Sequence, residues 1–420
     1  MTRRTAGEGR AIRDLLGDRN FALLWVGQLL SQIGDQCLLI AAIDLITDFS
    51  ASPLAILIPA ISMALPQVLF GLLGGVVADR WNRKLVMVAS DVLRGVIVLS
   101  VILVRTPDQL WILYLAAAGL ALVGTFFYPA RNATIPNLVP NGMLLTANGF
   151  IQGSYIIALI VGPAIAGIIV ELWNMQAAIV VDSVTFMLSA VAIFLINFPA
   201  RRTPKAVAAS GQKSMWQDMK TGLIFIQHSE PLRRALYVTA VATLGIGSVV
   251  ILAIPHLKTQ LGAGGLEYGV AMSMLGIGSV LGGLVVTRLS RRLSTNVIIG
   301  GMLGMAGVAI VVFAFAPNYA AVLGSVMVLG MCIVIARGAL DTLTQALAPD
   351  DVRGRVQAAV NLVMAAGTAL AEGLSAVLGH FLGVQGVFVA AGVITAVAGF
   401  ISIYALRAAA ESAAGGFRLK

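Results

Sequence analysis

Charged residues are scarce in this sequence of 420 residues. Aspartate, glutamate, lysine and arginine make up 11% of it, whereas a soluble domain has about 25%. Hydrophobic residues make up 59%, and the mean hydropathy is +0.93. This composition excludes a soluble globular protein, so we expect an integral membrane protein. A membrane-spanning helix takes about 20 apolar residues, which leaves room for twelve such helices and their connections.

Cysteine and histidine are also rare, with two and three residues respectively. Cys37 and Cys332 lie in separate apolar stretches, which argues against a disulfide framework and against a cysteine metal site. The histidines are scattered and form no set of metal ligands. The chain has no G-x-x-x-x-G-K motif to hold the phosphates of ATP, and no nucleophile is paired with a base. We therefore expect no enzyme activity, no cofactor and no metal.

The few charges are unevenly distributed along the chain. Of 28 lysines and arginines, 23 fall in the two tails or in alternate connections between apolar segments, whereas the opposite connections hold Arg105 and Lys258. Because cytoplasmic loops of membrane proteins are enriched in basic residues, this asymmetry predicts that both termini are cytoplasmic. It also indicates that the net charge of +9 sets the topology, and we expect no nucleic-acid partner.

A short basic turn between two apolar segments occurs twice. Residues 74–84 read G-G-V-V-A-D-R-W-N-R-K, and residues 282–292 read G-G-L-V-V-T-R-L-S-R-R. The copies are 208 residues apart, about half the chain length. Secondary transporters are commonly built from such internal repeats. The sequence thus predicts an all-α membrane protein with twelve transmembrane helices in two pseudo-symmetric six-helix bundles.

The longest polar connection separates the two predicted bundles. It is basic at its start and becomes amphipathic over 214–228, where apolar residues recur at helical spacing. Such a helix lies on a membrane surface, and an ordinary linker is the alternative. The expected order is a cytoplasmic tail with a short interfacial helix at 1–20, a bundle at 21–198, a cytoplasmic linker at 199–232, a second bundle at 233–407 and a cytoplasmic tail at 408–420.

The first basic turn resembles the loop signature of the major facilitator superfamily. The matching residues are Gly75, Asp79, Arg80, Arg83 and Lys84. The resemblance implies the twelve-helix fold of that family and a conformational latch on the cytoplasmic side. A carboxylate such as Asp79 is stabilised by the positive N-terminus of a neighbouring helix. The second copy has Thr287 in place of the aspartate, so we expect a weaker latch there.

Glycines and a proline in the fifth apolar segment resemble a helix-packing motif of exporters and antiporters in that superfamily. They are Gly153, Gly162, Pro163 and Gly167. Proline can bend a membrane helix, and glycine admits a close neighbour. The segments 21–35 and 351–356 are similar to the branch that contains enterobactin exporters and macrolide-efflux proteins. The resemblance implies export without identifying the substrate.

Polar residues inside apolar segments are candidates for the transport pathway, because an ionisable group in a membrane is costly. Asp35 lies near the middle of the first segment, on the same helical face as Gln28 and Gln32. It could exchange a proton for a substrate, or act only as a structural hydrogen-bonding group. Glu372 is a second proton or cation-site candidate, with a paired or mouth-lining carboxylate as the alternative. Four more residues are expected to line the cavity: Tyr128, Asn148, Gln152 and Tyr155.

Other charges in or beside the apolar segments are assigned to gating or to structure. Arg337 and Asp341 have the spacing of an ion pair within one helix. Asp91 and Arg94 receive the same structural interpretation, and Asp182 is a weaker candidate for a functional carboxylate. The expected inner gate and latch include Arg131, Arg337, Asp341, Arg353 and Arg355.

Together these features predict a proton-coupled exporter in the inner membrane of a bacterium. Its expected partners are a small amphiphilic substrate, protons and membrane lipids, and we expect it to work as a monomer. Drugs are the first substrate class, a siderophore or another secreted metabolite is the second, and a lipid flipped across the bilayer is the third. A transporter-like sensor or scaffold that moves nothing is the remaining alternative, and the short tails argue against it.

Overall fold

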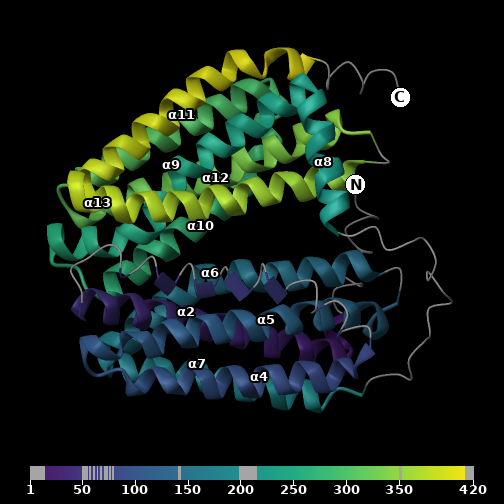
Figure 1. Cartoon of the computed structure of the whole chain (residues 1–420), viewed down its shortest axis with the longest axis vertical. Helices are drawn as coiled ribbons and strands as arrows, with labels where there is room; N and C mark the ends of the chain where they lie inside the picture. The colour runs from purple at the N-terminus through teal and green to yellow at the C-terminus, as the bar shows by residue number, and fades with distance from the viewer. Residues whose placement is uncertain are drawn as a thin grey trace. The chain divides into compact units, whose positions relative to one another are not determined.

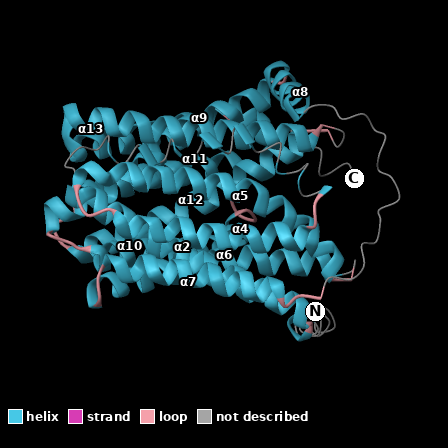
Figure 2. Ribbon diagram, turned by 60° about the horizontal axis from the view of Figure 1, so that its bottom comes forward, coloured by secondary structure: helices cyan, strands magenta, loops and turns pink. Residues whose placement is uncertain are grey.

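The described part of the chain is helical. The computed structural model describes residues 15–49, 80–140, 143–197, 215–349 and 352–411, together with eleven positions between 55 and 77. Every regular element within these residues is a helix (Figure 2). Ten helical segments in this part are long and apolar enough to cross a membrane. One further helix, α9, has 32 residues, which is also long enough to cross.

The helices belong to two compact units, whose elements are labelled in Figure 1. The first unit contains α2 (Arg19–Phe49), α4 (Arg83–Ser100), α5 (Leu110–Leu138), α6 (Leu144–Leu172) and α7 (Met175–Phe194), with the short helices η1 (Val101–Leu103) and η2 (Pro107–Gln109). The second contains α8 (Met215–His228), α9 (Glu230–Leu261), α11 (Thr295–Ala314), α12 (Tyr319–Leu347) and α13 (Arg353–Ala405). The helix α10 (Gly265–Leu289) contributes its turns up to Ser273 to the first unit and its remainder to the second.

Each unit has its own set of packed helices. In the first, α2 packs against α6 and α7, while α4 packs against α5 and α7. In the second, α9 and α11 both pack against α13, and α11 also packs against α12. Large aromatic side chains are fully buried in both units: Phe21, Phe127 and Phe186 in the first, and Phe313 and Phe388 in the second. Each unit therefore buries its own apolar core.

Glycines allow equivalent pairs of helices to approach closely in the two units. A Cβ atom added at Gly34 of α2 would meet the hydroxyl of Thr185 on α7. One added at Gly245 of α9 would meet the hydroxyl of Thr395 on α13. Gly245 lies 211 residues after Gly34, and Thr395 lies 210 residues after Thr185. The α2–α7 contact and the α9–α13 contact are thus the same contact in two repeats.

A polar contact near the helix ends gives a second equivalence. The Lys84 Nζ at the start of α4 donates a hydrogen bond to the carbonyl of Ile196 beyond α7, at 2.9 Å. The Asn296 Nδ2 at the start of α11 donates to the carbonyl of Ile403 near the end of α13, at 2.7 Å. The donors are 212 residues apart and the acceptors 207. The repeat predicted from the basic turns therefore extends into the packing of the helices.

The long helix α13 is interrupted at one glycine. Gly383 has φ of 70° and ψ of 161°, a backbone conformation that residues with a Cβ rarely adopt. The 53-residue run contains two candidate spans, Arg353–Gly379 and Phe381–Ala405, and Gly383 lies near the start of the second. The label α13 therefore covers two crossings.

The predicted amphipathic segment at 214–228 contains the helix α8. Its second half packs against the start of α13, where a Cβ at Gly222 would meet the carbonyl of Arg355. The buried side chain of Ile226 joins an apolar cluster with Val352 and Val356. This contact ties α8 to the beginning of α13 within the second unit.

The close contact between α11 and α13 can be tested with two glycines of one helix. A Cβ at Gly307 would meet the carbonyl of Gly392 and the nitrogen of Ala396, whereas nothing lies within 4 Å of a Cβ at Gly301. We expect Gly307→Val to lower the free energy of unfolding by about 1–3 kcal/mol, since overpacking forces the helices apart. Gly301→Val, on an exposed position of the same helix, serves as the control. Equal thermal stability of the two purified variants would contradict this packing.

Candidate functional site

The first unit contains a polar cavity of about 260 Å³. The helix α2 lines it with the side chains spaced along its polar face, and α5 and α6 supply the facing residues. Six residues predicted to form the substrate site meet at this cavity: Gln28, Gln32, Asp35, Tyr128, Gln152 and Tyr155. Ser31, Gln36, Arg94, Arg131, Ile151 and Ala158 complete its lining.

The side chains most available to a ligand are an acid, a glutamine and two tyrosines. Asp35 and Gln152 are exposed, and the exposed fractions of Tyr128 and Tyr155 are 48% and 57%. Gln28, by contrast, is 3% exposed, although it also lines the cavity. The cavity can therefore offer a carboxylate and aromatic faces to a ligand, a combination that suits organic cations.

Arg131 of α5 brings a positive charge to the same cavity. Its Nη1 donates a hydrogen bond to the Oε1 of Gln28 on α2, at 3.2 Å. Its Nε and Nη2 donate to the Oδ1 of Asn132 at 3.2 and 3.1 Å. The guanidinium carbon also lies 5.2 Å from the ring centroid of Tyr128. Arg131, assigned from the sequence to the latch and gate, is thus a cavity-lining residue linked to α2.

Arg94 is a cavity residue that the sequence analysis assigned only to structure. Its side chain is 8% exposed, and its Nη1 lies 3.6 Å from the Oδ1 of Asp91. Its guanidinium carbon lies 4.6 Å from the ring centroid of Phe127, 5.3 Å from that of Tyr128 and 5.6 Å from that of Phe186. The spacing of Asp91 and Arg94 indicated the ion pair, but no local pattern indicates that the arginine also reaches the cavity.

Two residues predicted for the substrate site lie elsewhere. Asn148 is exposed on α6 but does not line the cavity. Glu372 is half-buried on α13, in the second unit. The cavity of the first unit is therefore built without these two side chains.

The glycine-proline segment of α6 makes two close helix contacts. A Cβ at Gly162 would lie 2.6 Å from the Cγ of Gln36 on α2. A Cβ at Gly167 would lie 2.7 Å from the Cα of Leu266 at the start of α10, and the carbonyl of Pro163 occupies the corresponding space beside Gly269. Nothing lies within 4 Å of a Cβ at Gly153. No described residue makes a close contact at Gly153, and its packing role stays a prediction.

The basic turn joins helix ends within the first unit. Arg83 Nη1 donates to the carbonyl of Ala133 near the end of α5, at 2.7 Å, while Lys84 bonds to the Ile196 carbonyl beyond α7. Both contacts place a cation at the negative C-terminal end of a helix, where it is stabilised. Arg80 is exposed, and the predicted Gly75 and Asp79 lie outside the described residues.

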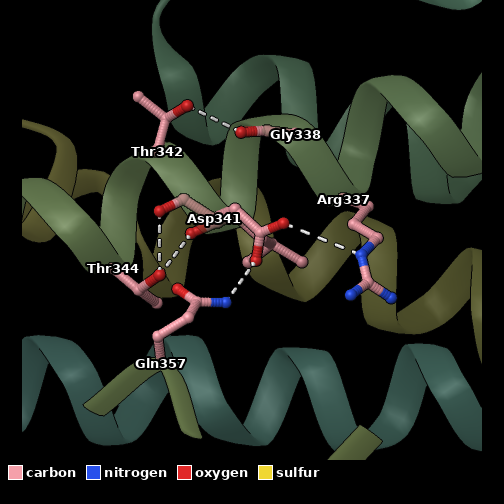
Figure 3. A network of polar contacts seen from close by, with 7 residues as sticks. Arg337, Gly338, Asp341, Thr342, Thr344 and Gln357 are labelled. Atoms are coloured by element: carbon pink, nitrogen blue, oxygen red, sulfur yellow. Dashed lines mark hydrogen bonds and ion pairs between the residues drawn. The ribbon is translucent and has the colours of Figure 1, made fainter. Parts of the chain in front are cut away.

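A polar network joins α12 to α13 in the second unit (Figure 3). The Arg337 Nε lies 3.7 Å from the Oδ2 of Asp341, and the Gln357 Nε2 donates to its Oδ1 at 3.1 Å. The hydroxyl of Thr344 donates to the backbone carbonyl of Asp341. Asp341 is thus shared between an arginine of its own helix and a glutamine of the next. Gln357 was missed in the sequence, since no spacing rule relates residues on different helices.

Two other predicted gate arginines, Arg353 and Arg355, lie at the start of α13, beside the end of α12. Arg353 Nε donates to the carbonyl of Gln345 at 3.0 Å, and its Nη2 donates to the carbonyl of Ala348 at 3.4 Å. These bonds satisfy carbonyl groups at the end of α12 that have no partner within the helix. Arg355 is half-buried in the first turn of α13. Arg353 therefore stabilises the connection between two helices.

The described residues contain no group of three or more histidine, cysteine, aspartate or glutamate side chains arranged to hold a metal ion. What the first unit offers is a cavity that carries both charge signs, inside a bundle of helices long and apolar enough to cross a membrane. This combination defines a membrane transporter. The chain belongs to the Major Facilitator Superfamily, whose family model matches residues 24–372 and 235–418. It is therefore a multi-pass membrane transporter of small molecules and not an enzyme.

Relatives with known names include exporters. The chain is 24% identical over 359 residues to a putative bacilysin exporter of Bacillus subtilis, covering 84% of this chain and 88% of the relative. It is 27% identical over 181 residues to macrolide efflux protein A of Streptococcus pyogenes, covering 43% of this chain and 45% of that protein. The resemblance to the major facilitator superfamily and to macrolide-efflux proteins, inferred above from sequence motifs, is confirmed.

The fold also matches solved transporters. A bacterial homologue of the human lysosomal transporter Spinster superposes with a TM-score of 0.69, at 15% identity, over 96% of this chain and 97% of the homologue. At this identity the likeness concerns the fold alone. The predicted all-α membrane fold is confirmed.

Two double-mutant cycles test how the Asp341 network is held. Arg337 is 50% exposed, so its coupling to Asp341 should be about 0.2–0.5 kcal/mol. The more sheltered hydrogen bond from Gln357 to the carboxylate should contribute about 1.5–3 kcal/mol. Alanine substitutions at each pair, followed by unfolding in mixed micelles, measure both coupling energies. A larger coupling for Arg337 than for Gln357 would overturn this order.

Proposed function

We propose that this protein is a proton-coupled exporter of small amphiphilic molecules in the bacterial inner membrane, with drugs as its first substrate class. The observation that carries the proposal is the exposed carboxylate of Asp35 in a cavity lined by tyrosines and glutamines. A carboxylate that a ligand can reach is able to bind either a proton or a cationic substrate. Competition between these two ligands for one site couples their movement in opposite directions.

The cavity suits a ligand with both apolar and polar parts. Tyr128 and Tyr155 supply aromatic surface, whereas Gln32 and Gln152 supply hydrogen-bonding groups that can donate or accept. The cavity volume of about 260 Å³ is close to the lower end of the range for small-molecule sites, about 300–1,000 Å³. Adaptable polar groups and aromatic faces favour binding of several related molecules over binding of one.

Transport would follow the alternating-access mechanism of secondary transporters. In this proposal, the bundles at 21–198 and 233–407 rock against each other, connected by the linker at 199–232. The basic turn with Asp79 and Arg83, together with the Asp341 network, acts as latch and gate on the cytoplasmic side. Glu372 is a second protonatable group for the cycle. The protein works as a monomer with both termini in the cytoplasm.

A dedicated exporter of one secreted metabolite is the second candidate. A putative bacilysin exporter aligns with this chain over most of both proteins, whereas the macrolide-efflux relative aligns over less than half. The two candidates differ in substrate range and share the same cavity and proton site. If the folded protein transports none of a panel of unrelated dyes, the result would favour the dedicated exporter.

The role of Asp35 can be tested in proteoliposomes that contain the purified protein and fluorescent amphiphilic cations. We expect a proton gradient to drive dye movement by the wild-type protein, and Asp35→Asn to reduce it to the level of empty liposomes. The reason is that an amide cannot bind and release the proton. Asp108→Asn, on an exposed residue of η2, is the matched control and should behave as wild type. Gradient-driven transport by Asp35→Asn at the wild-type rate would disprove this role.

The contribution of the tyrosines to substrate binding can be measured in the same system. We expect Tyr155→Ala to raise the apparent KM about tenfold, which corresponds to the loss of about 1.4 kcal/mol of apolar contact. Asn148→Ala, two turns earlier on α6 and outside the cavity lining, should leave KM unchanged. If both variants weaken binding equally, the cavity does not hold the substrate.

A further inference from the structure

Two carboxylates of the first unit are buried and have no hydrogen-bond partner among the described residues. Asp91 on α4 and Asp182 on α7 are both 0% exposed. Within the described part of the chain, neither oxygen of either carboxylate accepts a hydrogen bond. An ionised carboxylate in such a place is strongly disfavoured unless a positive charge and hydrogen bonds compensate it. These groups therefore need an explanation beyond packing.

Asp182 lies directly behind the carboxylate proposed to exchange protons. A Cβ added at Gly34 would come within 2.6 Å of the Oδ1 of Asp182, and Gly34 precedes Asp35 in α2. The two carboxylates are close enough to interact electrostatically. Asp35 is exposed at the cavity, whereas Asp182 is buried against the α2 backbone at Gly34. The pair thus consists of one group open to the cavity and one group closed off from it.

The charges around Asp182 do not balance. From α2 it faces Asp35 and the buried thiol of Cys37. From α4 it faces Arg94, which is already paired with Asp91 at 3.6 Å. Arg131 of α5 is directed to Gln28 and Asn132. With Arg131 counted at the cavity, two guanidinium groups stand near three carboxylates. One negative charge is then in excess, and one bound proton removes it.

The second unit shows that the fold does not require these charges. The equivalence of Gly34 with Gly245, and of Thr185 with Thr395, places Ile246 at the position of Asp35 and Gly392 at the position of Asp182. The equivalence of Lys84 with Asn296 places Leu303 and Ala306, both 1% exposed, at the positions of Asp91 and Arg94. The same helices therefore pack in the second unit with no charged side chain at any of the four positions.

We propose that Asp182 is a second proton-binding residue, which exchanges its proton with Asp35 and is held in place by the Asp91–Arg94 pair. In the exchange, the O–H bond of one carboxylic acid breaks as an O–H bond forms on the other carboxylate, so the net charge of the cluster is unchanged. The exposed group collects the proton from the cavity, and the buried group retains it while a substrate occupies the cavity. Only this last step rests on the proposed function.

Infrared spectroscopy of the purified protein in lipid tests proton binding without a substrate. Protonated carboxyl groups have a C=O stretching band that ionised groups lack, and the band is recorded across a pH titration. We expect Asp182→Asn to remove one titrating band completely, whereas the exposed control Asp108→Asn removes none of the buried bands. An unchanged set of bands in a folded Asp182→Asn protein would overturn the proposal.

A second variant keeps the test decisive if Asp182→Asn fails to fold. Asp35→Asn leaves Asp182 in place, and we expect the titration midpoint of the remaining buried band to move by about one pH unit, since coupled groups titrate together. An unmoved midpoint would overturn the exchange between the two carboxylates. If the bands behave as expected but no proton gradient drives transport, the proposed function fails while the proton site stands. If a proton gradient drives transport but the band pattern is unchanged in Asp182→Asn, the proposed function stands and the proton site at Asp182 fails.

Discussion

The close approach of helix backbones at glycines is the constraint on which the arrangement of each unit depends. Between membrane helices there is little hydrophobic driving force, so tight van der Waals contact and interhelical hydrogen bonds hold them together. At Gly34 the contact with α7 brings Thr185 and Asp182 against the backbone of α2. At Gly74 the carbonyl of Thr125 occupies the space that a side chain would fill. These contacts decide which polar groups stand beside one another in the membrane.

The two repeats use the same contacts and differ in what they place between them. In the first unit, the helices that meet at Gly34 carry Asp35 and Asp182, and the neighbouring α4 carries Asp91 and Arg94. In the second, the equivalent positions are apolar and the close contacts of α11 with α13 involve glycine, as at Gly307. Because buried charges stabilise a membrane protein poorly, the presence of charges at these positions in the first unit alone supports the transport role that we propose for them.

Local patterns in the sequence could predict much of this arrangement. Helical spacing placed Gln28, Gln32 and Asp35 on one face of α2, and the structure directs that face to the cavity. The spacing of Arg337 and Asp341 likewise indicated their approach within α12. Each of these features depends on residues within two turns of one helix, so periodicity is enough to find it.

Features that depend on which helices meet could not be predicted. Arg94 reaches the cavity because α4 packs beside α5, and Asp182 lies behind Asp35 because Gly34 admits α7. Gln357 likewise reaches Asp341 across a helix pair. The distances between residues on different helices depend on how all the helices pack. A pattern within one helix does not determine them.

Proton movement driven by substrate tests whether one cavity couples the movement of protons to the movement of substrate. Proteoliposomes containing a pH-sensitive dye would be given a gradient of a transported cation, with no initial difference in pH. We expect substrate that flows down its gradient to drive protons in the opposite direction. The internal pH should therefore change, and a protonophore should abolish the pH difference. Substrate movement with a constant internal pH would contradict coupling and leave a transporter driven by its substrate gradient alone.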